Sequence, residues 1–249
     1  GVVGEGEAYL YLGSSSWIAF ASSQPFYDPE KRTFTFHHLE KGLFMPTGTM
    51  QSAGGSYQWC RDALCEREKI LAQELGVSAY QLMDLEASKV PPGCDGLLFL
   101  PYLLGERAPW WNPHARGVFL GLTPSHNKPH LIRSVLEGVS LNLRIILDAF
   151  REQGLCPDTL RLIGGGAKGD FWSHILAQVL GVEILRPRYL EEATSLGAAI
   201  AGGVGAGIFK GLEVAKELVK IEDHFSPRAE MVEVYNRLYP IFKKAYLSL

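Results

Sequence analysis

The alternation of apolar and polar residues predicts several short strands near the beginning of the chain. Residues 8–21, AYLYLGSSSWIAFA, place two β-prone runs around a Gly-Ser-Ser-Ser turn, a pattern typical of a hairpin. Two further runs, at 33–36 and 43–46, follow at comparable intervals. The chain is therefore expected to open with strands.

A helical period replaces this alternation in the next segment. Residues 54–76 carry apolar side chains with charges between them, and Gly76 follows as a stop signal, so one amphipathic helix is predicted. The apolar run at 97–100 suits a buried strand, and the Pro-Trp-Trp-Asn-Pro stretch behind it predicts an ordered, aromatic-rich loop. A long helical pattern then covers residues 130–150.

Strand and helix patterns alternate in the second half of the chain. The predicted order is a strand that runs into a glycine turn, a helix, a strand and two helices, at 159–166, 171–180, 182–187, 195–206 and 230–247. Pro240 is expected to bend the last helix. This order favours an α/β fold with a mixed sheet flanked by helices on both faces, and no linker or repeat divides residues 1–249 into more than one domain.

Composition and charge exclude some partners. The 249 residues are 47% hydrophobic, enough for a full core, and the net charge of −3 argues against a nucleic-acid partner. Residues 193–209 are uncharged, but they contain five glycines and are shorter than the ~20 apolar residues of a spanning helix, so we expect an interior helix and its turn rather than a membrane segment. The four cysteines show no C-x-x-C spacing, and no signal peptide is recognised, which indicates reduced thiols and a cytoplasmic protein.

Three separated turns are rich in small residues, and each falls where a strand ends. They are IGGGAKGDFW from Ile163, the turn at 13–16, and Gly54-Gly55-Ser56 at the start of the first predicted helix. Glycine lets a backbone approach a ligand without an intervening Cβ, and ligands of open α/β sheets bind at the carboxyl ends of strands. Together the turns predict a phosphate or nucleotide site, although each alone could be only a tight turn; neither a P-loop nor a G-x-G-x-x-G fingerprint is present.

Several other polar residues could have a functional or a structural role. Lys168 could pair with a phosphate or be solvated, and the Glu106-Arg107 pair could reach a cleft or anchor its own aromatic loop. Arg116 is expected to cap neighbouring carbonyl groups. For His126 and His130, Pro129 argues against a shared helical face, so no protein-ligated metal site is predicted.

Five motifs in order resemble the C-terminal half of the FGGY carbohydrate kinases, and among these the xylulose kinase branch. The motifs are LGSSSW, SAGGSYQW, YLLGERAPWWNPHARGVFLGL, LRLIGGGAKGDFWSHILAQVLGVEI and EEATSLGAAIAGGVGAGIF, and they cover nearly the whole chain. The resemblance implies a ribonuclease H-like, actin-type ATPase domain. It would be the second of two such domains, with the nucleotide and the sugar held between them.

The resemblance also implies which residues contact the nucleotide. Carried over motif by motif, they are Gly13 and Ser14 at the phosphates, Gly54 at the phosphates, Gly165 and Gly166 against the nucleotide, and Asp170 near the adenosine. Ser14 stands where the family commonly has threonine, and Asp170 where other members often have asparagine. A carboxylate cannot donate a hydrogen bond as an amide can, so Asp170 could only accept one from the nucleotide.

The family's general base lies before the first of these motifs, so no catalytic residue and no metal ligand are assigned here. The implied cofactors are ATP and Mg²⁺, and the implied partners are the absent N-terminal domain, a sugar, and a second copy if the exposed end of helix 130–150 supports a homodimer. D-xylulose is the expected acceptor. The alternatives are glycerol, gluconate or another polyol, or a non-catalytic actin-like interaction module; the isolated chain is expected to be inactive.

Overall fold

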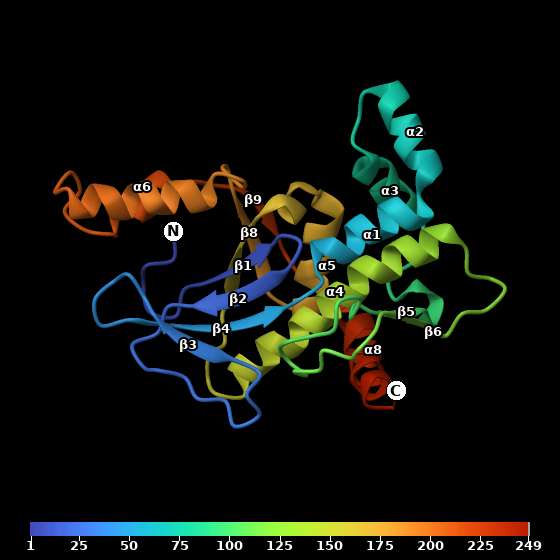
Figure 1. Cartoon of the computed structure of the whole chain (residues 1–249), viewed down its shortest axis with the longest axis horizontal. Helices are drawn as coiled ribbons and strands as arrows, with labels where there is room; N and C mark the ends of the chain where they lie inside the picture. The colour runs from blue at the N-terminus through green and yellow to red at the C-terminus, as the bar shows by residue number, and fades with distance from the viewer. Residues whose placement is uncertain (249) are drawn as a thin grey trace.

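A computed structural model describes residues 1–248 and is built around one large mixed sheet (Figure 1). Seven strands lie in the order β3-β4-β2-β1-β7-β8-β9. Their bounds are β1 Ala8–Leu12, β2 Ser16–Phe20, β3 Phe34–His37, β4 Phe44–Met50, β7 Thr159–Ile163, β8 Glu183–Pro187 and β9 Ile221–Phe225. The predicted α/β class and the mixed sheet flanked by helices are confirmed.

The parallel part of the sheet places two of the glycine turns at one edge. Strand β1 pairs with β2 in antiparallel register but with β7 in parallel, with Tyr9 opposite Arg161 and Tyr11 opposite Ile163. Parallel neighbours end at the same edge of a sheet. The turn that follows β1 and the glycine loop that follows β7 are therefore adjacent, although about 150 residues separate them in the chain.

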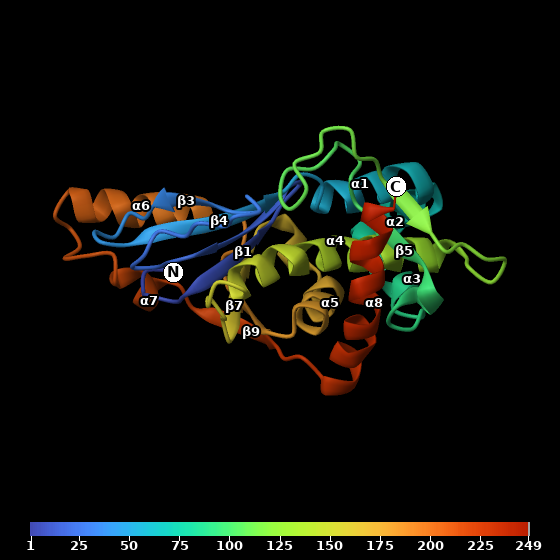
Figure 2. The same cartoon turned by 90° about the horizontal axis from the view of Figure 1, so that it is seen from below.

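The core lies between the sheet and two helices, α4 (Lys128–Arg151) and α5 (Asp170–Leu180). Leu10 and Leu12 of β1 face these helices and are fully buried. On the opposite face of the sheet lies α6 (Ala193–Gly205), as the two views show (Figures 1 and 2). Most of α4 is buried, so the helix considered for a dimer contact is the central core helix. A homodimer stays a prediction.

The remaining elements surround this core. They are α1 Gly54–Leu64, α2 Glu66–Leu75, α3 Ala79–Ala87, α7 Val214–Leu218 and α8 Ala229–Leu247, the short 3-10 helices η1 Cys94–Gly96 and η2 Gly165–Lys168, and the strands β5 Leu98–Leu100 and β6 Val118–Leu120. Strands β5 and β6 form a separate two-stranded sheet. The predicted strand at 97–100 thus exists but does not join the main sheet.

The predicted helix at 54–76 is two helices. It breaks at Cys65, where φ is −120° and ψ is 43°, and the Cys65 side chain is fully buried at the break. Beyond it α2 projects away from the core (Figure 1), and its apolar Ile70, Leu71 and Leu75 are about half exposed. The apolar period continues without interruption across Cys65, so it gives no sign that the backbone turns there, and the sequence predicts one helix.

The glycine-rich segment forms the predicted helix, but the predicted interior position of that helix is wrong. Of α6, only Ile200 and Gly203 are buried, so its small residues lie on the surface rather than in a close-packed interior. Uncharged composition indicated burial, but small residues contribute little apolar area and tolerate exposure. Among residues 1–248, no helix is long and apolar enough to cross a membrane.

Candidate nucleotide site

The three glycine turns converge on one cavity of about 610 Å³. Five of the six residues expected at a nucleotide line it: Gly13, Ser14, Gly54, Gly165 and Gly166. They come from the β1–β2 turn, the start of α1 and the loop after β7. Segments far apart in the sequence therefore share one hollow at the carboxyl edge of the parallel strands.

Backbone hydrogen bonds lock the β1–β2 turn to the start of α1. The Gly54 N–H donates to the Gly13 carbonyl at 2.8 Å, and the Gly55 N–H donates to the Ser14 carbonyl at 2.9 Å. A Cβ at Gly54 would lie 2.4 Å from the Gly13 carbonyl oxygen, which no real side chain tolerates. Gly54 is thus required by the contact between two backbones, whatever binds beside it.

The three consecutive glycines after β7 have different surroundings. Gly164 has φ of +95°, a conformation that favours glycine, and Gly166 would place a Cβ 2.6 Å from the side chain of Leu12. A Cβ added at Gly165 would meet no atom within 4 Å, so open space lies over this residue. Two of these glycines serve the turn and the packing, and Gly165 is the one that leaves backbone free to approach a ligand.

Helices α1, α3 and α5 build the opposite wall of the cavity. Its lining residues there include Tyr57, Tyr80, Asp84 and Trp172. The Tyr57 ring packs edge-on against Trp172 at 5.5 Å between ring centroids and lies 5.0 Å from Tyr80. The aromatic groups give this end an apolar surface, in contrast to the bare backbone at the glycine turns.

Asp84 is the carboxylate of this wall. The Tyr57 hydroxyl donates to Asp84 Oδ1 at 2.7 Å. Burial raises the pKa of the Asp84 carboxyl to about 6; the Tyr57 hydrogen bond opposes the rise, and the negative charge of Asp170 adds to it. At neutral pH the cavity therefore holds a partly buried negative charge at the aromatic end.

Asp170, the sixth expected residue, is not among those that line the cavity. Its Oδ1 lies 2.7 Å from Arg186 Nη1, and its side chain is 70% exposed. Lys168 does line the cavity, where its Nζ lies 2.8 Å from Glu191 Oε2. A contact from Asp170 to a nucleotide would have to compete with the Arg186 ion pair, and it stays a prediction.

A second hollow of about 430 Å³ lies on the other face of the sheet, beneath α6. Tyr9, Tyr11 and Trp17 form its floor, with the Tyr11 and Trp17 rings stacked at 4.0 Å. None of the six expected residues lines it. The cavity at the glycine turns is therefore the candidate site.

The Glu106-Arg107 pair anchors its own loop. Glu106 is buried, and its Oε1 accepts hydrogen bonds from the Gln51 N–H at 2.6 Å and the Arg107 N–H at 2.8 Å. The Arg107 Nε donates to Gln51 Oε1 at 2.6 Å. Neither residue lines the candidate site. In the same loop Arg116 donates to the carbonyls of Pro113 and Ala115, which confirms the expected capping role.

Glu106→Gln is expected to remove a pH dependence of folding stability. Burial raises the pKa of Glu106 to about 7, against the hydrogen bonds from Gln51 and Arg107. Because the folded-state pKa lies above the unfolded value of about 4.3, the folded protein binds the carboxyl proton more tightly than the unfolded chain does. The stability that this proton contributes is complete below about pH 4.3 and is lost as pH rises towards 7. Between pH 5 and pH 8 the stability of the variant should therefore rise by about 2.5 kcal/mol relative to that of wild type.

Urea unfolding at pH 5, 6, 7 and 8 measures this difference, with Glu230→Gln on the exposed start of α8 as the matched control. A constant difference between Glu106→Gln and wild type across these four values would contradict the raised pKa.

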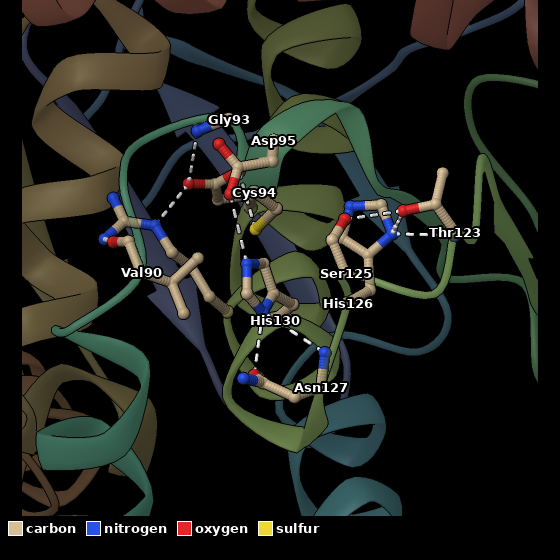
Figure 3. Close-up of polar contacts among 11 residues, drawn as sticks. Val90, Gly93, Cys94, Asp95, Thr123, Ser125, His126, Asn127 and His130 are labelled. Carbon is tan, nitrogen blue, oxygen red and sulfur yellow. Dashed lines mark hydrogen bonds and ion pairs between the residues drawn. The ribbon is translucent and has the colours of Figure 1, made fainter.

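The histidines before and within α4 hold loops together (Figure 3). His130 lies 2.7 Å from Asn127 Oδ1 through Nδ1 and 3.2 Å from Asp95 Oδ2 through Nε2. The Thr123 N–H donates to His126 Nδ1 at 2.9 Å. The two imidazole rings lie 5.2 Å apart, although His126 precedes α4 and only His130 belongs to the helix. No group of three potential metal ligands occurs within the part of the chain that the structure describes.

Sequence reasoning missed the wall supplied by α3, because it predicted no helix there. The signal was present: Ser78 and Gln81 form a capping box, in which the Ser78 N–H donates to Gln81 Oε1 at 2.9 Å. A serine followed three residues later by glutamine marks a helix start. With that helix predicted, Tyr80 and Asp84 become candidates for the site.

Comparison with known proteins identifies relatives. Residues 8–206 match the model of the FGGY family of carbohydrate kinases, C-terminal domain. The chain is 34% identical to a gluconokinase of Bacillus licheniformis over 242 residues, which is 96% of this chain and 46% of the relative. It is 30% identical to a xylulose kinase of Bacillus subtilis over 247 residues, which is 99% of this chain and 47% of the relative.

A solved structure agrees with these matches. The crystal structure of xylulose kinase from Rhodospirillum rubrum superposes with a TM-score of 0.84 at 33% identity, covering 100% of this chain and 48% of that chain. The chain thus spans about half the length of the relatives it matches. By its sequence match, its fold and the arrangement of its glycine turns, the chain belongs to the FGGY family of carbohydrate kinases.

Proposed function

We propose that this chain is the ATP-binding half of a sugar kinase and that it works with an N-terminal half like the one its relatives carry. The observation that carries the proposal is the cavity where three glycine turns meet. Its volume of about 610 Å³ falls in the range of small-molecule sites. The family match supports a kinase over a non-catalytic actin-like module.

The cavity fits a nucleoside triphosphate chemically. The N–H groups of Ser14 and Gly165 make no hydrogen bond within residues 1–248, and open space lies over Gly165. Free backbone N–H groups at a turn bind phosphate oxygens. The aromatic wall of Tyr57 and Tyr80 at the other end suits a nucleoside.

Phosphoryl transfer asks a protein mainly to position the phosphates and to stabilise charge. In this proposal the glycine turns hold the donor's phosphates in place, and Mg²⁺ bound with ATP neutralises part of their charge. The residues that bind the sugar and take its proton lie in the N-terminal half. Residues 1–249 are then one C-terminal nucleotide-binding domain, acting in the cytoplasm and inactive on its own.

D-xylulose is the acceptor that we propose, on the strength of the five motifs and of the xylulose kinases among the relatives. Gluconate is the second candidate, because the gluconokinase of Bacillus licheniformis is the more identical of the two relatives compared. The surroundings of the acceptor belong to the N-terminal half in either case.

Two measurements test this function. Calorimetry should detect binding of Mg-ATP to the 249-residue chain and no binding of D-xylulose, gluconate or glycerol. A protein that joins the chain to an N-terminal half should phosphorylate D-xylulose, while the chain alone should not. No affinity for ATP would overturn the proposed site. A joined protein that phosphorylates gluconate and ignores D-xylulose would overturn the choice of acceptor only.

A further inference from the structure

Asp84 leaves one carboxylate oxygen without a partner inside the candidate site. It lies on α3 and lines the cavity. The Tyr57 hydroxyl occupies Oδ1 at 2.7 Å, but no hydrogen bond from residues 1–248 reaches Oδ2. Asp84 Oδ2 is not one of the buried polar atoms that lack a partner, so water reaches it from the cavity. A ligand that enters the cavity can replace this water without loss of affinity only by donating a hydrogen bond to Oδ2, so the oxygen indicates a place for a donor group of a ligand.

The adjoining glycine keeps the space beside this oxygen open. A Cβ at Gly169 would meet a single atom within 4 Å, Asp84 Oδ2 at 3.1 Å. Gly169 has φ of −86° and ψ of 119°, a conformation that any residue adopts, so the backbone does not require glycine there. What the absent side chain does is leave room next to Oδ2.

The neighbouring cations are engaged elsewhere. Lys168 pairs with Glu191, and Arg186 pairs with Asp170 and Asp223. No ion pair to Asp84 occurs in the part of the chain described here. The charge of Asp84 is therefore uncompensated, and it repels phosphate while attracting N–H and O–H groups.

These contacts indicate how ATP is oriented in the cavity, and the inference rests on the proposed function. We infer that Asp84 binds the nucleoside end of ATP, with Oδ2 accepting a hydrogen bond from a ribose hydroxyl or from the amino group of the base. The phosphates then lie at the far end, against Gly13 and Gly165. Asp84 is thus a residue that selects and orients the nucleotide.

The test compares Mg-ATP binding by wild type, Asp84→Ala and the control Glu230→Ala, measured by calorimetry on the 249-residue chain at pH 8, where Asp84 is ionised. Glu230 is an exposed carboxylate at the start of α8 and does not line the cavity. A lost hydrogen bond to a charged acceptor should weaken binding by Asp84→Ala at least tenfold. The control should bind like wild type.

Gly169→Ala provides a second variant with a small change. Its methyl group would stand 3.1 Å from Asp84 Oδ2 and should weaken Mg-ATP binding severalfold while the thermal unfolding midpoint stays within a few degrees. Thermal unfolding of all variants confirms that each is folded when it is titrated.

Nucleotide analogues separate the two hydrogen-bond donors. If a ribose hydroxyl is the donor, 2′-deoxyATP or 3′-deoxyATP should bind wild type about tenfold more weakly than ATP and should be insensitive to Asp84→Ala. If the amino group is the donor, purine riboside triphosphate should behave in this way. ATP binding that changes less than twofold in Asp84→Ala, or an equal loss for every analogue, would overturn the inference and leave the proposed function standing. Wild type that does not bind ATP would overturn the function itself.

Discussion

Gly165→Val is expected to weaken nucleotide binding strongly and to leave the fold intact. No atom lies within 4 Å of a Cβ at this position, and Gly165 does not need a left-handed backbone, so a side chain can be added without strain. The valine would occupy the space over the glycine loop that we assign to the phosphates. Mg-ATP affinity should fall by roughly a hundredfold, about 2.7 kcal/mol, as measured by calorimetry.

The neighbouring Gly166→Val is the matched comparison, since it should lose folding stability rather than nucleotide affinity. Its Cβ would lie 2.6 Å from the Leu12 side chain, which is fully buried beneath the loop. Forcing a branched side chain into that contact should cost about 1–3 kcal/mol of folding stability, visible in thermal unfolding. If Gly165→Val is folded and binds Mg-ATP like wild type, then Gly165 does not face the nucleotide. If it is destabilised like Gly166→Val, then the space over Gly165 is not open.

This pair shows what the sequence could predict about the site and what it could not. The three glycine turns are visible as motifs, and the strand before each turn indicates that they meet at one edge of a sheet. The individual roles of Gly164, Gly165 and Gly166 are not visible. They depend on φ at Gly164 and on the distance from Gly166 to Leu12, a residue about 150 positions away in the chain.

The fold was predictable wherever local pattern and tertiary packing agree. The hairpin of β1 and β2 and the succession β7, α5, β8 follow from alternation, from glycine turns and from helix periodicity. Strand β9 was missed, because its sequence IEDHF carries three charged or polar residues of five and only Phe225 is buried. An edge strand with one buried face position leaves a weak signal.

The buried ion pair within α4 carries the second large effect. Glu137 Oε1 lies 2.7 Å from Arg133 Nε, and it accepts hydrogen bonds from the Tyr235 hydroxyl at 2.7 Å and the Gly93 N–H at 3.0 Å. Both charged side chains are less than 10% exposed. Through these contacts one carboxylate joins α4 to α8 and to the turn before η1.

Glu137→Ala is therefore expected to destabilise the protein by about 3–5 kcal/mol, because it leaves the Arg133 charge buried without a partner. Urea unfolding at 25 °C measures the loss. Glu213→Ala removes the exposed partner of Lys216 and should leave the stability nearly unchanged, so the two variants compare a buried with an exposed ion pair.

The loss of stability in Glu137→Ala should come from the buried Arg133 charge that is left without a partner, rather than from the lost attraction between the two side chains. The double variant Arg133→Met with Glu137→Leu removes both charges and keeps similar volume, so it should recover most of the stability that Glu137→Ala loses. A double variant as unstable as Glu137→Ala would show instead that the hydrogen bonds to Tyr235 and Gly93 hold α8 and the turn in place. A loss below about 1 kcal/mol in Glu137→Ala would contradict the assignment of a buried, paired charge to this carboxylate.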